Sequence, residues 1–152
     1  MLTRLQDVFE SFQKNNVKYV VIGGVASVLH GVPRTTFNLD ILIEASSDNA
    51  QRLLKALTDA GFGTATLTNP DDLVANEITV FADKVRIDVQ TQTPGLKFQD
   101  AWLRRKTINY HGQDFFVVSR ADLIASKRAC NRPIDMEDVR ALEETDRQDS
   151  TQ

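Results

Sequence analysis

The sequence predicts an α+β fold in which helices flank a mixed β-sheet and further helices follow at the C-terminal end. Two short runs rich in β-branched residues, 17–22 and 39–43, lie on either side of a helical segment. Two hairpins are also expected, each built from alternating segments around a short polar turn: residues 77–82 with 85–90, and residues 107–110 with 114–118. Because hairpins join antiparallel strands, the sheet is expected to contain strands of both directions.

Capping and breaking residues place the expected helices along the chain. Polar residues at 46–48 and Asn69 are expected N-caps, with Pro70 at the first position of the helix that follows Asn69. Gly31 and Gly61 are expected just past helix ends. Helices are therefore expected, in chain order, over residues 2–12 and 25–30, from 47 to before Gly61, from Pro70, over 98–105, from Ser119, and over 135–145.

Length, composition and charge bound the kinds of protein that this chain can be. With 152 residues we expect one domain over residues 1–146 and a frayed polar tail over residues 147–152. There is no run of about eighteen apolar residues and no signal-peptide pattern at the start, so we expect a cytoplasmic protein without a membrane span. A net charge of −3 argues against a broad basic face for duplex DNA.

Few residues are available as soft metal ligands. The chain has one cysteine, Cys130, and two histidines, His30 and His111. This composition excludes an internal disulfide framework and a zinc site built from cysteine or histidine clusters. Any bound metal is therefore expected to be held mainly by oxygens.

A pair of glycines, Gly23 and Gly24, stands at the junction between the first expected strand and the helix after it. Glycines at such a junction let backbone N–H groups approach a phosphate, and the helix dipole adds partial positive charge there. A tight turn without a ligand is the commoner reason for paired glycines. No Gly-Lys-Ser/Thr sequence follows, so the junction is not a Walker loop.

Single acids interrupt two strands that are otherwise apolar. Asn38 and Asp40 are two residues apart on one strand and therefore point to the same face, and Asp88 interrupts a later strand in the same way. Two such aspartates could meet and hold Mg²⁺, which prefers carboxylates, water and substrate phosphates. Two plainer interpretations remain open: Asp40 is solvated at the open end of the sheet, or Arg86 neutralises Asp88 in a salt bridge.

Residues 19–44 resemble the core of the nucleotidyltransferase superfamily, which has the DNA polymerase β-like fold. The family pattern is a strand, a Gly-Gly or Gly-Ser turn, a helix, an Asp-x-Asp strand and a third Asp on a later strand. Gly23-Gly24, Asp40 and Asp88 match it, and Arg34-Thr35-Thr36 resembles the Arg-x-Thr that precedes the acids in small bacterial members. Residues 119–143 resemble the C-terminal signature of the AbiEii-like toxin branch, through Lys127, Arg132, Asp135 and Asp138.

One residue departs from the family pattern. Asn38 stands where the first Asp of the pair usually lies. An amide offers a neutral carbonyl oxygen, so the site should bind metal more weakly than one with three carboxylates. Three explanations remain open: a variant of reduced or specialised activity, a non-catalytic descendant, or a chain altered to silence a toxic enzyme.

The resemblance implies a role for each matching residue. Gly23, Gly24 and the hydroxyl of Ser27 would bind nucleotide phosphates, with Arg34 and Arg132 as further phosphate contacts. Asn38, Asp40 and Asp88 would hold Mg²⁺ or Mn²⁺. The catalytic residues would be Asp40, Asp88 and Lys127, with Asp88 orienting or deprotonating the attacking hydroxyl. The plainer interpretation of Lys127, Arg128 and Arg132 is a solvated basic helix face, and that of Asp135 is a helix cap paired with Arg132.

The function implied is Mg²⁺-dependent transfer of a nucleoside monophosphate from an NTP to a hydroxyl on RNA or protein. An antitoxin or a helical partner subunit is an implied partner. Because of Asn38, a nucleotide-binding module without turnover and a bare interaction domain are the alternatives. Geometrically, we expect Asn38, Asp40 and Asp88 to converge on one cleft beside Gly23-Gly24. Lys127 should face the same cleft, with Ala125 and Cys130 turned toward the core.

Overall fold

A single mixed sheet organises the computed structural model, which describes residues 2–150 and the side chains of residues 4–147. Its six strands lie in the order β3-β4-β2-β1-β6-β5. Strands β1–β2, β3–β4 and β5–β6 pair antiparallel, whereas β1–β6 and β2–β4 pair parallel. The strands are β1 (Tyr19–Ile22), β2 (Asn38–Ile43), β3 (Ile78–Ala82), β4 (Arg86–Gln90), β5 (Lys106–Tyr110) and β6 (Gln113–Val117).

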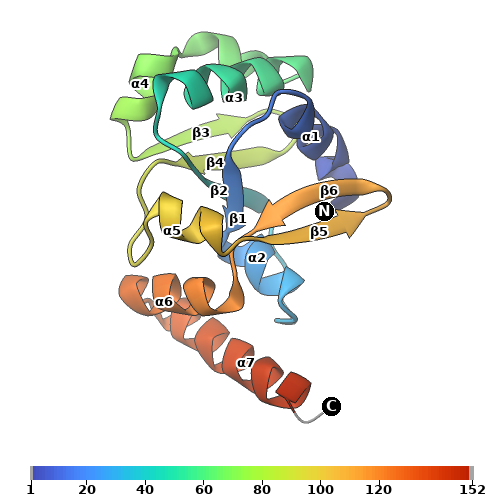
Figure 1. The fold of residues 1–152 in the computed structure, drawn as a ribbon, viewed down its shortest axis with the longest axis vertical. Helices are drawn as coiled ribbons and strands as arrows, with labels where there is room; N and C mark the ends of the chain where they lie inside the picture. The colour runs from blue at the N-terminus through green and yellow to red at the C-terminus, as the bar shows by residue number, and fades with distance from the viewer. Residues whose placement is uncertain (1, 151–152) are drawn as a thin grey trace.

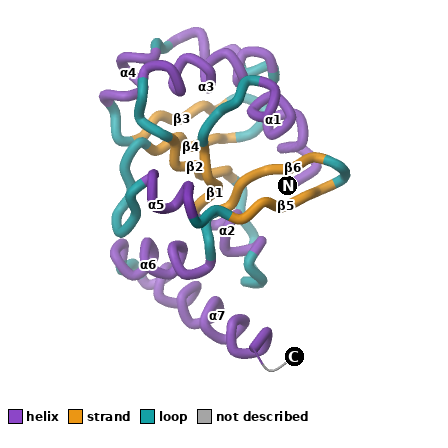
Figure 2. The backbone as a smooth tube through the Cα atoms, viewed as in Figure 1, coloured by secondary structure: helices purple, strands orange, loops and turns teal. Residues whose placement is uncertain are grey.

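Helices lie on both sides of this sheet, as the α+β expectation required (Figures 1 and 2). One group, α1, α3 and α4, lies at the top of the view, and α6 and α7 lie at the bottom. The helices are α1 (Leu2–Lys14), α2 (Gly23–Leu29), α3 (Ser47–Asp59), α4 (Pro70–Ala75), α5 (Phe98–Leu103), α6 (Arg120–Cys130) and α7 (Pro133–Ser150), with a 3₁₀ helix η1 (Gly63–Leu67). None of the helices within residues 2–150 combines the length and the apolar character needed to cross a membrane.

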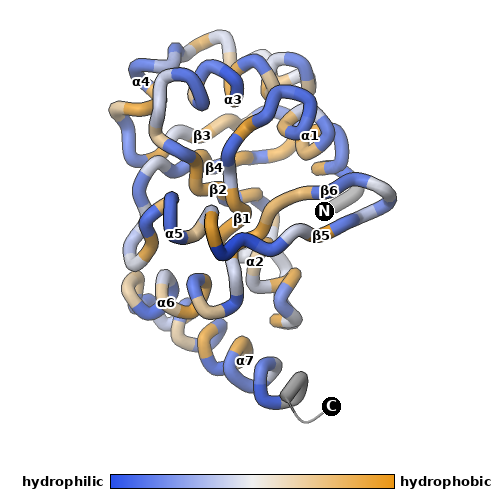
Figure 3. Tube along the Cα trace, viewed as in Figure 1, coloured by the Kyte–Doolittle hydropathy of each residue, from blue (hydrophilic) through white to orange (hydrophobic). Residues whose placement is uncertain are grey.

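The core lies between the sheet and the helices α1 and α3. The central strands β1 and β2 carry runs of apolar residues (Figure 3). The ring of Phe9 on α1 stacks on Phe115 of β6 with centroids 4.4 Å apart, so an aromatic contact fixes the first helix on the sheet. In β2, Leu39 and Ile41 are fully buried while Asn38 and Asp40 are only partly buried, and the strand is buried on both faces from Ile41 onward. The face that carries Asp40 is therefore open at the start of the strand.

Strand register brings the chemistry-bearing residues together on the open face. In the parallel pair β2–β4, Asp40 is the direct partner of Asp88, and Asn38 is the direct partner of Arg86. In the antiparallel pair β1–β2, Ile22 is the partner of Asp40, so the chain leaves β1 beside that acid. Direct partners point to the same face of a sheet. The sheet therefore places the acids and the glycine turn at one point.

The expected capping residues are confirmed. Ser46, Asn69 and Ser119 accept hydrogen bonds from the backbone N–H groups of Asn49, Asp72 and Asp122. Several helix ends differ from the expectation: α1 extends to Lys14, α2 begins at Gly23, α5 ends at Leu103, and α7 runs from Pro133 to Ser150. The 3₁₀ helix η1 was not expected. Residues 147–150 of the expected frayed tail are helical, and residues 151 and 152 lie outside the described part.

Candidate active site

A cleft of about 740 Å³ lies over the open face of the sheet. It is bounded by the turn after β1, the segment before β2, strands β2 to β4, helix α6 and the start of α7. Asn38, Asp40 and Asp88 converge in it beside Gly23 and Gly24, as expected. Of the other residues singled out in the sequence, Arg34, Lys127 and Arg132 also line the cleft.

Asp40 and Asp88 affect each other across the two strands. Burial raises the pKa of Asp40 to about 7, and the charge of Asp88 and a hydrogen bond with it act in the same direction. The positive charges of Arg86 and Lys127 oppose this rise in pKa only in part. Asp40 is therefore not simply solvated at the end of the sheet. It is a carboxyl group whose ionised form lacks enough positive charge in its surroundings.

Arg86 forms the salt bridge that the sequence left as an alternative for Asp88. Its Nε donates to Asp88 Oδ1 at 2.8 Å and its Nη2 donates to Oδ2 at 3.2 Å. This two-point contact fixes the plane of the Asp88 carboxylate. The Arg86 side chain stays 57% exposed while that of Asp88 is 14% exposed, so the guanidinium forms part of the open side of the cleft. The sequence indicated Arg86 only as a neutralising partner, not as a site residue.

Asn38 lies on the same face as the two acids. Its Nδ2 donates to Asp40 Oδ1 at 3.2 Å, which directs one half of the amide toward the carboxylate. Thr36 Oγ1 donates to the backbone oxygen of Asn38 at 3.4 Å, but among the described residues no donor contacts its side-chain oxygen, Oδ1. That oxygen is therefore available to a ligand within the cleft.

Both glycines are required by close contacts. Gly23 has a positive φ of +67°, and a Cβ at this position would lie 2.4 Å from Asp40 Oδ2. A Cβ on Gly24 would lie 2.9 Å from Thr36 Oγ1. The backbone thus passes directly against the acid, which only glycine permits. The structure corrects the expectation for Ser27: it is fully buried, donates to the carbonyl of Gly23 at 3.2 Å and does not line the cleft.

Lys127 lies in the wall of the cleft and is only 6% exposed, so the interpretation of a solvated basic face is wrong for this residue. Its Nζ lies 2.8 Å from Asp138 Oδ2 and 3.8 Å from Asp135 Oδ1. Arg128, the next residue, is exposed and pairs with Glu143. Two adjacent cations of one helix therefore have different surroundings.

The other two cations of the cleft are held by the same pair of aspartates on α7. Arg34 Nη1 lies 2.6 Å from Asp138 Oδ2, and Arg132 Nε lies 2.7 Å from Asp135 Oδ2. Asp135 also accepts a hydrogen bond from the backbone N–H of Arg132 at 3.2 Å, which confirms its expected capping and pairing role. Buried charges are tolerated when they are paired in this way. The network fixes three cations on the wall that faces Asp40 and Asp88.

The orientation of α6 corrects a second expectation. Ala125 is exposed and Cys130 lies at the surface of the cleft, so neither turns into the core. The buried positions of this helix are Asp122, Leu123, Ser126 and Lys127. Asp122 is buried because Arg104 binds both of its oxygens, at 3.0 and 2.9 Å.

The chain matches a known protein family over almost its whole length. The family described as "Nucleotidyltransferase of unknown function (DUF6036)" matches residues 2–150 of the chain. The chain belongs to this family. Membership confirms the expected nucleotidyltransferase relationship at the level of the family. The finer expectation, the AbiEii-like toxin branch, stays a prediction.

Two solved structures share the fold of this DUF6036 protein. An antigenic nucleotidyltransferase-like protein from Paracoccidioides brasiliensis is 18% identical, with a TM-score of 0.62 over 92% of this chain and 73% of that one. A nucleotidyltransferase candidate from Thermotoga maritima is 15% identical, with a TM-score of 0.55 over 99% of this chain and 93% of that one. At these identities the likeness shows the fold alone. No curated protein matches the chain.

The donor set of the DUF6036 cleft fits one hard divalent cation. Asp40 and Asp88 supply carboxylate oxygens and Asn38 supplies a free carbonyl oxygen, and water and phosphate oxygens could complete six-fold coordination. Burial, and after it the neighbouring Asp88, raises the pKa of Asp40, and a cation bound between the two acids would favour its ionised form. Within the described residues, no group of three or more His, Cys, Asp or Glu side chains is placed to hold a metal. A cation here would therefore need oxygens besides the two carboxylates, and the amide oxygen of Asn38 lies on the same face as both acids.

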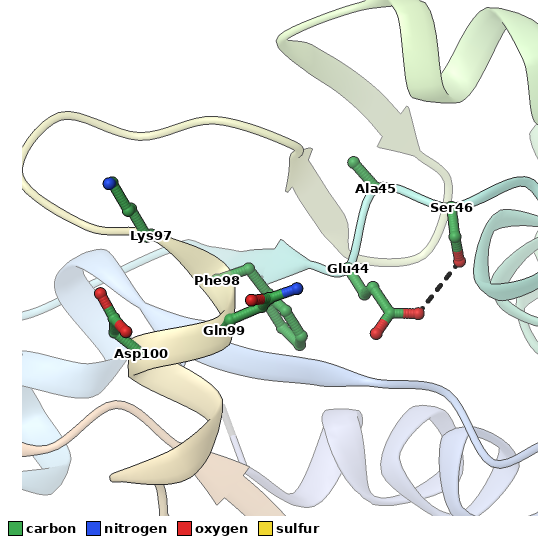
Figure 4. Close-up of a pocket in the computed structure, with 7 residues that line it drawn as sticks. All are labelled: Glu44, Ala45, Ser46, Lys97, Phe98, Gln99 and Asp100. Carbon is green, nitrogen blue, oxygen red and sulfur yellow. Dashed lines mark hydrogen bonds between the residues drawn. The ribbon is translucent and has the colours of Figure 1, made fainter.

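A second pocket, of about 490 Å³, lies between the end of β2 and the start of α5 (Figure 4). Glu44 is directed toward Ser46, which donates to its Oε1 at 3.1 Å (Figure 4). Lys18 also pairs with Glu44. Glu44 is therefore already paired with its neighbours, and none of the residues that line this pocket also lines the cleft.

Proposed function

We propose that this DUF6036 protein is a Mg²⁺-dependent nucleotidyltransferase that transfers a nucleoside monophosphate from an NTP to a hydroxyl group of an RNA or a protein. The observation that carries the proposal is the direct pairing of Asp40 with Asp88, beside a glycine turn and opposite a wall of fixed cations. Phosphoryl transfer requires mainly positioning and neutralisation of charge, and the cleft supplies both.

In the proposed reaction, the acceptor oxygen attacks the α-phosphorus of the NTP. A bond forms between that oxygen and phosphorus, and the bond from phosphorus to the pyrophosphate oxygen breaks, with its electron pair leaving on pyrophosphate. The proton of the acceptor hydroxyl passes to the Asp88 carboxylate and then to solvent. Mg²⁺ or Mn²⁺, when bound by Asn38, Asp40 and Asp88, supplies positive charge for the phosphates and the developing alkoxide.

The side chains around the acids have separate tasks. Gly23 and Gly24 allow phosphate oxygens to approach the backbone without meeting a Cβ. Lys127, Arg34 and Arg132 face the phosphates from the opposite wall, and α7 holds them in place through Asp135 and Asp138. Because these cations are fixed before substrate arrives, little ordering is needed at the moment of reaction.

A transfer assay tests this proposal. The protein would be incubated with each of the four NTPs, labelled at the α-phosphate, together with total RNA or total protein and Mg²⁺. We expect label to be incorporated into one acceptor class and to be lost in EDTA. Asp40→Asn should abolish the signal, whereas Asp71→Asn, at an exposed aspartate of α4, should leave it intact. Incorporation that survives Asp40→Asn would contradict the assigned site.

A second candidate function is nucleotide binding without turnover. The observations that favour it are the neutral amide at Asn38 and the occupation of both Asp88 oxygens by Arg86. Calorimetric titration of NTPs with and without Mg²⁺ separates the two functions. Binding of equal strength in both conditions, with no label transferred, would support the binding module.

The proposal extends to a toxin of a toxin–antitoxin pair, whose antitoxin or helical partner subunit would restrain it. The support is the likeness of Lys127, Arg132, Asp135 and Asp138 to the AbiEii-like signature. Induced expression in bacteria provides the test. We expect growth to stop with the native chain and to continue with Asp40→Asn. Growth that continues with the well-expressed native chain would count against a toxin.

A further inference from the structure

The charges around Asp88 differ from those of a site built for two metal ions. Two oxygen-bound ions about 4 Å apart form a clamp in which one serves the attacking oxygen and the other the leaving oxygen. Their charge of +4 requires several carboxylates nearby. On the sheet side of the cleft the acids are Asp40 and Asp88, and the other polar position on this face of β2 is the neutral Asn38. The remaining acid of the lining, Asp135, is already paired with Lys127 and Arg132.

Arg86 adds positive charge at the level of Asn38. The two residues are direct partners across β2 and β4, so the guanidinium starts from the position opposite the missing carboxylate. It reaches along its own strand to bind both oxygens of Asp88, at 2.8 and 3.2 Å. The acid on β4 therefore already has a cation bound at two points, and the side chain of that cation is 57% exposed toward the cleft.

We infer that the cleft takes one divalent cation and that the Arg86 guanidinium supplies the second positive charge of the clamp, on the acceptor side of Asp88. The inference rests on the proposed function. The single ion would be held by Asp40 and the carbonyl oxygen of Asn38, with Asp88 shared between the ion and Arg86. Neutral Asn38 and positive Arg86 have the same effect on the site. Asn38 lacks a negative charge and Arg86 offsets that of Asp88, so too little negative charge is left to bind a second ion.

The chemistry of arginine suits this task. A guanidinium has five N–H donors in a plane, and Asp88 takes up two of them. The remaining donors can bind the acceptor oxygen or an oxygen of the α-phosphate, where negative charge develops during transfer. A guanidinium also keeps its charge at every pH at which the protein is folded. Arg86 is therefore a catalytic residue in this inference, because it would touch the reacting atoms.

The metal count tests the inference directly. Mn²⁺ would be titrated into the protein saturated with a non-hydrolysable NTP analogue, and free Mn²⁺ would be measured by electron paramagnetic resonance. We expect one ion per native chain. The double variant Asn38→Asp/Arg86→Ala has three carboxylates and lacks the competing cation, so it should bind two. Arg128→Ala, which removes an exposed arginine from the outer side of α6, should keep the native count.

Each result has a distinct meaning. Two ions on the native chain, or one ion on a folded double variant, would overturn the role of Arg86 while leaving a metal-dependent transferase in place. If the native chain binds neither Mn²⁺ nor nucleotide, the proposed function fails, and this inference fails with it.

The single variants provide a second readout that does not depend on the folding of the double variant. Arg86→Ala should lower kcat of transfer about 100-fold, the cost typical of one lost charge-stabilising donor, with an unchanged KM for NTP. Arg86→Lys should recover part of that loss because it keeps the charge. Equal rates for Ala and Lys, or a loss seen only in KM, would contradict a charge acting in the transition state.

Discussion

Asp40 and Asp88 lie directly opposite each other on two parallel strands, in a cleft where the charges of Arg86 and Lys127 only partly oppose the rise in the pKa of Asp40. Burial and the neighbouring Asp88 make the ionised form of Asp40 unfavourable unless a further cation binds beside it. The site is therefore held at a cost to stability when it is empty of ligand. Several measurable consequences follow from that cost.

The metal-free protein should lose stability as pH rises. Asp40 has a pKa of about 7 in the folded chain against an ordinary 3.8, so the folded state holds this proton more tightly than the unfolded state does. Its contribution is most favourable below the unfolded pKa and is lost as pH rises to about 7. Roughly 4 kcal/mol is the upper bound for this loss, at 1.36 kcal/mol for each pKa unit.

Urea unfolding in EDTA at pH 5 and pH 8 measures this effect. We expect the native protein to be less stable at pH 8, and Asp40→Asn to reduce the difference because it removes the titrating group. A difference of the same size in both proteins would assign the pH dependence to another residue.

Asn38→Asp should make the protein more dependent on Mg²⁺. A third carboxylate on this face repels Asp40 two residues away, so the variant should melt at a lower temperature than the native chain in EDTA. It should gain more from millimolar Mg²⁺, because a ligand that binds only the folded state stabilises it by about 2.7 kcal/mol at 100 times its Kd. Melting curves in EDTA and in Mg²⁺ measure both effects. Equal Mg²⁺ responses would mean that position 38 is not a metal ligand.

Lys127→Ala should weaken both folding and nucleotide binding. The change leaves Asp138 and Asp135 with one cation fewer in a buried setting, and we expect a loss of stability of about 2 kcal/mol or more. NTP binding should weaken by roughly 1.5–3 kcal/mol, the worth of one charge-assisted contact. Arg128→Ala is the matched control, since its surface ion pair is worth under about 1 kcal/mol. NTP binding to both variants would be measured by calorimetry, and their unfolding free energy by urea unfolding. If Lys127→Ala and Arg128→Ala weaken NTP binding and stability to a similar degree, Lys127 lies outside the site.

Lys127 and Arg128 are adjacent on α6, and the difference in their surroundings could not be predicted from helical periodicity. Composition and helical spacing do not distinguish Lys127 from Arg128, because both are cations of one helix. The expectation that Lys127 faces the cleft came from its match to the AbiEii-like signature. Their difference comes from α7, which brings Asp138 to Lys127 and to Arg34, a residue 104 positions away in the chain. Contacts over that separation depend on how whole elements pack, and no periodicity records them.

The two acids and their strands could be predicted from the residues immediately around them. An aspartate in the middle of an apolar strand is costly to bury without a purpose, so Asp40 and Asp88 were visible as single interruptions. Their direct pairing depended on the order of the strands, which spacing does not give. Ser27 shows the opposite case: its place after the glycines suggested a phosphate contact, but the helix turns its hydroxyl back to Gly23.

Gly23→Ala should damage the site and the fold together. The new Cβ would lie 2.4 Å from Asp40 Oδ2 in a backbone conformation with positive φ, so both the turn and the carboxylate must move. We expect a loss of about 1–3 kcal/mol in unfolding free energy and weaker binding of Mn²⁺. Gly63→Ala is the control, since a Cβ there meets nothing within 4 Å. A Gly23→Ala protein with native stability and native Mn²⁺ affinity would contradict the close approach.

The position of Cys130 has a practical consequence for all of these experiments. It is the one thiol in the sequence, and the structure places it on the wall of the cleft, half-buried between Lys127 and Arg132 along the chain. A maleimide fluorophore would therefore attach to the unaltered chain at a single known position within the cleft. Occupancy could then be followed in real time as a change in emission, and the label would need no engineered substitution.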